Sequence, residues 1–303
     1  MVNKNKLLLI ANNAAIDATI YTKGDAIVNY SQVNQVPLEQ IAGIGDEIID
    51  ISFLTTQGLA LAGAPANAQQ QVLETIKQLP NGWISKKESL DGFLEFYDLA
   101  RKKGITHVVT DRDGVVYCKG DYSRGREFQV LLENMGIDNN PHIAVLTGSG
   151  YVQNQRFMIE YGMTQKLSDI NSVKRDPYLL LAENGLIQIN VLTGETRNLC
   201  GILNQDLLKR LKKEFEPKVI KEMQKSQGIL EELGLSWSND YEDQKAKVFI
   251  PPKQAMTTFN VPREYANGKP DYRKSPEADH FRKQVIKVME KTAKRLNIPY
   301  QVI

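Results

Sequence analysis

The stretch Ile105-Thr-His-Val-Val-Thr-Asp111-Arg-Asp-Gly-Val115 joins a short apolar run to two aspartates and a glycine. Apolar runs this short are typical of strands buried on both faces, as in a parallel sheet. Two similar runs are Ile41-Ala-Gly-Ile-Gly before Asp46 and His142-Ile-Ala-Val-Leu before Thr147. Segments with helical spacing lie between the runs, so the alternation predicts an α/β fold with right-handed crossovers.

Polar side chains are expected at one edge of this sheet. In open α/β sheets, ligands bind beyond the carboxyl ends of the strands, and Asp46, Asp111 and Thr147 each directly follow an apolar run. Asp113 is close enough to Asp111 to share a cation with it, and Gly114 allows a sharp turn beside the pair. A structural interpretation is also open, because aspartate and glycine are common in turns.

Three segments carry residues that suit an anionic ligand or a cation. Asp46 and Asp50 are four residues apart, so a helix beginning here would present both on one face, although helix capping accounts for the same residues. The motif Thr147-Gly148-Ser-Gly offers a hydroxyl and backbone N–H groups that can hold phosphate oxygens. Lys23 opens an expected helix, where a lone lysine is more often an ordinary surface residue.

The pattern changes after about residue 182, and the remainder is predicted to form a second α/β module. Strands are expected at 186–191, 247–250, 256–261 and 300–303. Helical spacing runs from 204 to 234, where Pro217 is expected to break or kink the helix, and from Phe281 to Leu296. A further helix of the first module is expected at Tyr151–Tyr161.

Composition excludes several functional classes. The chain has 303 residues, 42% of them hydrophobic and 24% charged, which is typical of a globular protein with about two domains. A net charge of +2 argues against a dedicated nucleic-acid-binding protein. Because no apolar run suits a membrane span or a signal peptide, we expect a cytoplasmic protein with neither nucleic-acid nor membrane partners. Two cysteines and three scattered histidines indicate neither a disulfide framework nor a zinc site.

Taken together, the segments resemble the haloacid-dehalogenase-like (HAD) phosphatases. The family has four motifs, and each occurs once here, as Asp111-Arg-Asp-Gly-Val115, Thr147-Gly148 after its strand, Lys23-Gly-Asp-Ala-Ile27 and Gly45-Asp-Glu-Ile-Ile-Asp50. The segment Ala182-Glu-Asn-Gly185 resembles the start of the cap that is inserted in the sugar-phosphatase branch. Ile49 departs from that branch, which often has asparagine there, and resembles the small-cap or capless phosphatases instead.

The motifs stand in a different order from that of the family, in which the aspartate pair comes first. Here Lys23 and the acidic motif precede it. We therefore predict a circularly permuted, Rossmann-like HAD core at residues 17–184, with an α/β cap formed by residues 185–303 and 1–16. The chain ends would lie on neighbouring cap strands, at 6–10 and 300–303, that a cut hairpin has separated. The rival explanation is that two unrelated half-domains adjoin.

The resemblance implies a role for each motif residue. Asp111 would attack phosphorus, Asp113 would act as general acid and base, and Thr147 and Lys23 would bind the phosphoryl oxygens. The implied cofactor is Mg²⁺, and the implied substrate is a small phosphate ester. The metal ligands would be Asp46, Asp50, Asp111 and Asp113, and the substrate-binding residues would be Gly114, Gly148 and Asn184.

The sequence therefore favours a Mg²⁺-dependent phosphatase that acts on a small phosphorylated metabolite, such as a sugar phosphate. Two alternatives stay open. A phosphomutase or phosphotransferase would pass the phosphoryl group to an acceptor other than water. A non-catalytic phosphometabolite-binding protein would keep the fold and the pocket without turnover. The sequence carries no information on the oligomeric state.

Overall fold

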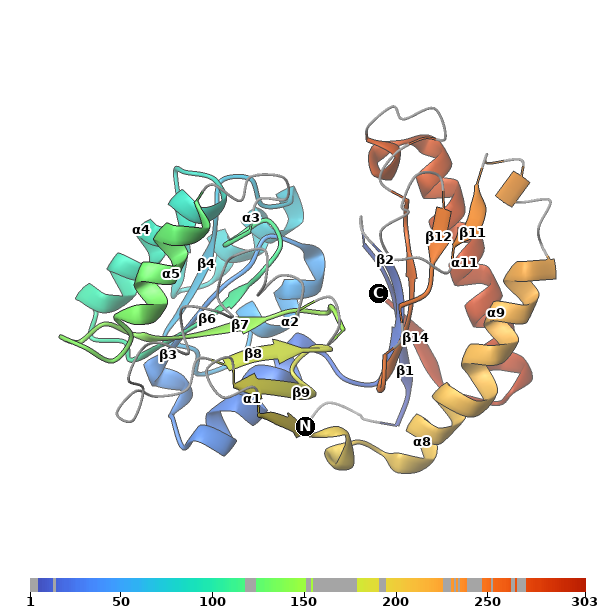
Figure 1. Cartoon of the computed structure of the whole chain (residues 1–303), viewed down its shortest axis with the longest axis horizontal. Coiled ribbons are helices and arrows are strands. Elements are labelled where there is room, and N and C mark those ends of the chain that lie inside the picture. Colours follow the sequence, from blue (N-terminus) through green and yellow to red (C-terminus); the bar gives the residue numbers. More distant parts are fainter. Residues whose placement is uncertain are drawn as a thin grey trace. The chain divides into compact units, whose positions relative to one another are not determined.

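Two β-sheets organise the chain, as the computed structural model shows (Figure 1). The structure describes residues 5–12, 15–117, 124–150, 154, 179–190, 195–225, 230, 231, 233, 235–238, 247–251, 253–262, 265 and 271–303. The chain forms two compact units. We call them the core unit, Thr22–Leu199, and the terminal unit, Met1–Tyr21 together with Cys200–Ile303.

The core unit is built on an eight-stranded sheet with the strand order β10-β9-β8-β7-β6-β3-β4-β5. The strands from β8 to β5 in this order are parallel to their neighbours, whereas β9 and β10 are antiparallel additions at one edge. The strands are β3 (Ile41–Ile44), β4 (Leu61–Ala64), β5 (Gly82–Ile84), β6 (His107–Asp111), β7 (His142–Leu146), β8 (Leu179–Ala182), β9 (Ile187–Asn190) and β10 (Thr196–Asn198).

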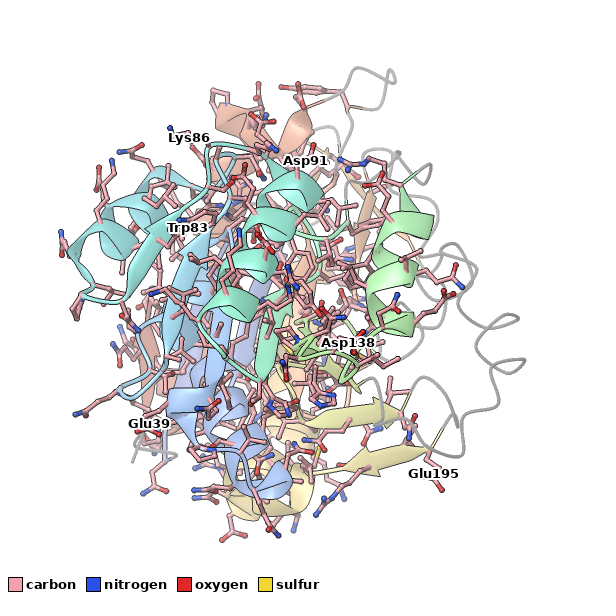
Figure 2. The ribbon with its side chains drawn as sticks, turned by 90° about the vertical axis from the view of Figure 1, so that its left-hand side faces the viewer. Glu39, Trp83, Lys86, Asp91, Asp138 and Glu195 are labelled. Carbon is pink, nitrogen blue, oxygen red and sulfur yellow. The ribbon has the colours of Figure 1, made fainter. Side chains whose placement is uncertain are left out.

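Helices cover both faces of this sheet. They are α1 (Lys23–Asn34), α2 (Ile51–Leu54), α3 (Gln70–Gln78), α4 (Ser89–Lys102) and α5 (Gly125–Glu133), with 3-10 turns η1 (Leu38–Gln40) and η2 (Ile48–Asp50). Figure 2 shows α4 and α5 in front of the sheet, where Trp83 marks β5 and Asp91 the first turn of α4. A Cβ on Gly63 would meet Phe96 of α4, and one on Gly43 would meet Phe53 of α2, so these helices approach the backbone of neighbouring strands closely.

The apolar runs of the sequence form the buried centre of the core sheet. All four residues of β3 are buried, as are the last four of β6 and of β7. Fully buried aromatic rings from α4 and α5, Phe93, Phe96 and Phe128, pack in the hydrophobic core on one face. The predicted α/β class with a largely parallel sheet is confirmed. The helix expected at Tyr151–Tyr161 lies outside the described residues except for Asn154.

The boundaries between the two units differ from those expected from the sequence. The expected domains were 17–184 and 185–303 with 1–16, whereas the core unit is Thr22–Leu199. Strand β2 (Ala15–Thr19) pairs over its whole length within the terminal unit, so a boundary at residue 17 would cut it. Strands β9 and β10 belong to the core sheet, because β9 pairs antiparallel with β8 and β10 pairs with β9. The backbone hydrogen bonds between β8 and β9 therefore place residues after 184 in the core unit, which the hydrophobic pattern of the sequence did not predict.

The terminal unit contains a six-stranded sheet with the order β11-β12-β13-β2-β1-β14. Its other strands are β1 (Leu7–Ala11), β11 (Ser236–Ser238), β12 (Lys247–Phe249), β13 (Met256–Asn260) and β14 (Tyr300–Val302). The helical elements are η3 (Cys200–Ile202), α8 (Gln205–Arg210), η4 (Leu211–Phe215), α9 (Glu216–Lys225), η5 (Tyr272–Lys274) and α11 (Pro276–Arg295). Among the described residues, none of the helices combines the length and apolar character that crossing a membrane requires.

Two expectations for this unit need correction or refinement. Strands β1 and β14 are neighbours as expected, but they are parallel, so a cut hairpin between them is wrong: hairpin arms are antiparallel. The disturbance expected at Pro217 takes the form of the π-helical segment η4, which joins α8 to α9. Proline lacks the N–H that would complete the regular helical hydrogen bond four residues back, and a wider turn accommodates this loss.

Candidate functional site

The polar residues expected at one sheet edge follow three adjacent strands. Strand β6 is hydrogen-bonded to β3 on one side and to β7 on the other, and all three are parallel. Their carboxyl ends therefore lie at the same edge. Asp46 follows β3, Asp111 is the last residue of β6, and Thr147 follows β7 directly.

Lys23 reaches this edge from the first turn of α1. Thr22 caps the helix: its hydroxyl accepts a hydrogen bond from the Asp25 N–H at 3.1 Å, and the Asp25 carboxylate accepts one from the Thr22 N–H at 3.0 Å. The Lys23 side chain is only 3% exposed, and its Nζ lies 2.6 Å from Asp50 Oδ1 and 2.5 Å from Asp111 Oδ1. One ammonium group therefore links the acidic segment to the end of β6.

Asp50 fixes the loop that carries Asp46. Its Oδ2 accepts hydrogen bonds from the backbone N–H of Asp46 at 2.9 Å and of Glu47 at 3.0 Å. The backbone carbonyl of Asp46 accepts a further bond from the Gln69 N–H at 2.8 Å. Asp50 is thus engaged by one ammonium and two amides, whereas the position of Asp46 is set through its backbone.

The site holds more negative than positive charge. Carboxylate oxygens of Asp46, Asp50 and Asp111 lie within 4.8 Å of one another, and all three residues are buried. Among the described residues, Lys23 is the ammonium group that contacts Asp50 and Asp111, and Oδ1 of Asp46 is buried without a hydrogen-bond partner. Buried charges need compensation. The residues therefore fit a metal ion, and hard carboxylate oxygens are the ligands that Mg²⁺ prefers.

The charge imbalance shifts the pKa values of the site. Burial raises the pKa of Asp46 to about 10, and repulsion from Asp111 and Asp50 acts in the same direction. Burial also raises the pKa of Asp111 to about 8, although Lys23 opposes the shift. For Lys23, burial by itself lowers the pKa, but attraction to Asp111 and Asp50 outweighs it and leaves the pKa above its usual value. Without a metal, burial and mutual repulsion therefore favour the protonated form of Asp46 and Asp111.

Gly114 brings the turn after β6 against Asp46. Its φ is +82°, a conformation that side chains rarely adopt, and a Cβ there would lie 2.1 Å from Asp46 Oδ2. Asn67 donates from Nδ2 to the Gly114 carbonyl at 3.0 Å and accepts at Oδ1 from the Ser89 N–H at 2.7 Å. Glycine is therefore required here for both its conformation and its size.

Asp113 lies apart from the buried cluster in its contacts. Its side chain is 52% exposed and pairs with Arg112, whose Nη2 lies 2.5 Å and Nε 3.1 Å from Asp113 Oδ2. The Arg112 guanidinium also donates to Ser149 Oγ at 3.0 Å and to Asn154 Oδ1 at 2.8 Å. Among the described residues, Asp113 forms no hydrogen bond or ion pair with Asp46, Asp50 or Lys23, and it is not one of the three carboxylates that lie close together.

The turn after β7 is organised around Thr147. Its Oγ1 accepts from the Ser149 N–H at 3.1 Å, and its backbone carbonyl accepts from the Asn184 N–H at 2.9 Å. A Cβ on Gly148 would lie 3.3 Å from Asn184 Oδ1. Thr147, Gly148 and Asn184, which the sequence suggested as contacts for the substrate or its phosphate, therefore lie side by side.

Sequence reasoning missed three residues of this region: Arg112, Ser149 and Asn154. Arg112 had a usable signal, because a charged residue between two aspartates at the end of a buried strand needs partners of its own. Ser149 stands in the Thr147 motif, but its sequence position gave no sign of the hydrogen bond from Arg112. Asn154 carried no signal, since it stands in a segment without a recognisable motif. No protein-family model, curated protein or solved structure matches this chain.

Proposed function

We propose that the chain is a Mg²⁺-dependent phosphatase of a small phosphorylated metabolite, with a circularly permuted HAD-like core and a cap contributed by the terminal unit. The observation that carries the proposal is the meeting of Lys23, Asp46, Asp50 and Asp111, from three separate segments, around one buried set of carboxylates. A plain helix cap or strand-end turn would not need a lysine and a second acidic segment 27 to 88 residues away.

The metal would be held by Asp46 and Asp111, with Asp50 in support and, by the resemblance, the backbone carbonyl of Asp113. When bound, Mg²⁺ would supply positive charge that offsets repulsion between the anionic nucleophile and the anionic phosphate. The partnerless oxygen of Asp46 and the raised pKa values of Asp46 and Asp111 support a site that gains from a cation.

Hydrolysis of the phosphate ester would take place in two steps. In the first, a carboxylate oxygen of Asp111 forms a bond to phosphorus, the ester P–O bond breaks, and Asp113 gives a proton to the departing alkoxide. In the second, water attacks the aspartyl-phosphate and gives a proton to Asp113, the bond from phosphorus to Asp111 breaks, and inorganic phosphate leaves. Lys23 and the Thr147 turn bind the phosphoryl oxygens, whose charge grows in the transition state.

Two features of the fold support the permuted arrangement. The strands that end at the three motif segments, β3, β6 and β7, are neighbours in one parallel sheet although their order in the chain differs from that of the family. Residues from both chain ends, in β1 and β14, pair within the terminal unit, as expected if the ends fall inside a cap. Two unrelated half-domains would have no reason to assemble one set of motifs.

A phosphatase screen tests the proposal. We expect the purified protein to release phosphate from at least one member of a panel of sugar phosphates, nucleotides and phospho-acids, and only with Mg²⁺ or a similar divalent cation. Asp111→Asn should lower turnover by at least about 10³-fold and leave the unfolding transition in place. Asp98→Asn, which changes a surface aspartate of α4, is the matched control. Retained activity in Asp111→Asn would refute the nucleophile, and inactivity towards the whole panel would refute the phosphatase.

A second candidate, a non-catalytic phosphometabolite-binding protein, is favoured by one observation. The Asp113 carboxylate is paired with Arg112 rather than directed by a contact with the buried cluster. In this candidate the pair would be purely structural, and Asp113 would transfer no proton. Binding of a phosphate ester without release of phosphate would support this candidate. A phosphomutase, in contrast, would give an isomeric product and little free phosphate.

A further inference from the structure

Arg112 is an unusual residue for its position. It is 6% exposed at the end of a buried strand, directly between the two aspartates. Its guanidinium contacts Asp113 Oδ2 twice, at 2.5 and 3.1 Å, and reaches Ser149 Oγ and Asn154 Oδ1 at 3.0 and 2.8 Å. It therefore connects the turn after β6 to the turn after β7.

Ser149 and Asn154, which Arg112 contacts, are themselves held in place by hydrogen bonds. Asn154 is fully buried, and its Nδ2 donates to the backbone carbonyls of Ser149 at 3.1 Å and Gly150 at 3.0 Å. The Ser149 N–H in turn donates to Thr147 Oγ1. The guanidinium is thus anchored to the same turn that carries Thr147, so whatever Arg112 holds is placed relative to that turn.

Arg112 holds one oxygen of the Asp113 carboxylate. Both of its N–H contacts go to Oδ2, and Oδ1 has no hydrogen-bond partner among the described residues. A carboxylate that is 52% exposed would otherwise sample several rotamers at little cost. The pair selects one rotamer and leaves Oδ1 available to another group.

We propose that Arg112 is a positioning residue for proton transfer by Asp113: it sets the direction of the free carboxylate oxygen relative to the Thr147 turn. The inference rests on the proposed function, and it deepens it, because it gives the Arg112–Asp113 pair a task within turnover. The planar guanidinium is needed, since its separate nitrogens contact Asp113, Asn154 and Ser149 at once, and the compact ammonium of lysine cannot reproduce this fixed arrangement.

The consequence is a dependence on the leaving group. An alkoxide is a poor leaving group and needs a proton as the ester bond breaks, whereas 4-nitrophenolate leaves readily without one. Loss of the positioning residue should therefore lower kcat/KM, which reports the step in which the leaving group departs, far more for alkyl phosphates than for 4-nitrophenyl phosphate. General damage to the site would slow both alike.

The test compares kcat/KM for the best alkyl phosphate of the screen and for 4-nitrophenyl phosphate, because kcat/KM reports the step in which the leaving group departs and not the later hydrolysis of the aspartyl-phosphate, which both esters share. Arg112→Met should lower kcat/KM for the alkyl ester by about 100-fold, the scale of a general acid, and for the aryl ester by less than about 5-fold. Asp113→Asn should give the same selectivity, and the double variant should lose little more than either single one. Arg101→Met, which breaks a surface arginine–aspartate pair on α4, should change neither substrate.

Arg112→Lys keeps the buried charge, so it serves as a second variant in case Arg112→Met fails to fold. It should keep the unfolding transition and still show the selective loss on the alkyl ester. Equal losses on both esters, or full activity of Arg112→Lys, would overturn the positioning role while leaving the phosphatase intact. Absence of turnover in the unchanged chain would overturn the proposed function first and this inference with it.

Discussion

At the scale of single residues, the main feature of the site is a shortage of positive charge. Among the residues that the structure describes, three buried carboxylates lie close together, Lys23 is the ammonium that contacts two of them, and Asp46 keeps a buried oxygen without a hydrogen-bond partner. A folded protein can relieve such a cluster by keeping a proton or by binding a cation. The raised pKa of Asp46 corresponds to keeping a proton, and a bound metal would replace that proton.

This competition predicts how stability depends on pH. Because the pKa of Asp46 is about 10 in the folded state, against 3.8 for an ordinary aspartate, the folded state holds a proton between these values that the unfolded state has lost. The free energy of unfolding of the metal-free protein should therefore fall as pH rises from 5 to 9, by up to about 1.4 kcal/mol per pH unit for one proton. Urea unfolding at a series of pH values measures it.

Two comparisons isolate the contribution of Asp46. Asp46→Asn removes one of the two titrating groups, so it should make the fall with pH shallower and leave the part that comes from the raised pKa of Asp111. Mg²⁺ competes with the proton, so it should stabilise the unchanged protein more at pH 9 than at pH 6 and have little effect on Asp46→Asn. A variant with the slope of the unchanged protein would contradict the assignment of the proton to Asp46.

At the scale of elements, the turn after β6 decides whether the site can form. Gly114 lies at φ +82° directly against Asp46, and Asn67 holds its carbonyl. Gly104, which follows α4, has a similar φ of +71° but nothing within 4 Å of the place where a Cβ would lie. The two glycines share the backbone requirement and differ only in their surroundings, so they make a matched pair.

Gly104→Ala should cost about 1 kcal/mol, the usual strain of a left-handed non-glycine residue. Gly114→Ala carries the same strain and also forces a methyl group against the Asp46 carboxylate. It should cost more and abolish the stabilisation by Mg²⁺, whereas Gly104→Ala keeps it. Thermal unfolding with and without Mg²⁺ measures both effects. If the two variants responded equally to Mg²⁺, contact between Gly114 and the metal site would be refuted.

At the scale of the whole molecule, the two units differ in how the chain builds them. The core unit is one continuous segment, Thr22–Leu199, with its own hydrophobic core. The terminal unit combines both ends of the chain, and in its sheet β2 and β1 stand between β13 and β14. The first unit has what it needs to fold alone, and neither piece of the second does.

Residues 22–199 expressed alone should therefore unfold in one cooperative transition and respond to Mg²⁺, because Lys23, Asp46, Asp50 and Asp111 are all present. Residues 200–303 alone should not fold, since the strands that join β13 to β14 are missing. Circular dichroism during heating tests both fragments. A folded 200–303 fragment, or a 22–199 fragment without a transition, would contradict this division.

The sequence by itself determined the features that local pattern encodes. Short apolar runs specified buried parallel strands, and each motif residue was expected at a strand or helix end, where the structure places Lys23, Asp46, Asp111 and Thr147. These predictions succeed because burial on both faces and the chemistry of turns are read within a few neighbouring residues. The strand pattern predicted that Asp46, Asp111 and Thr147 share one edge of the sheet, and the resemblance to a family added Lys23 to this group.

Only the tertiary structure decided what depends on contacts between distant segments. The Lys23–Asp111 ion pair joins residues 88 apart, and the Arg112–Asn154 bond joins residues 42 apart. The parallel pairing of β1 with β14 and the place of β9 and β10 in the core sheet likewise come from long-range hydrogen bonds. Local pattern shows that a side chain or strand edge needs a partner, but which partner it finds, and the burial that shifts the pKa of Asp46, follow from the packing of the whole unit.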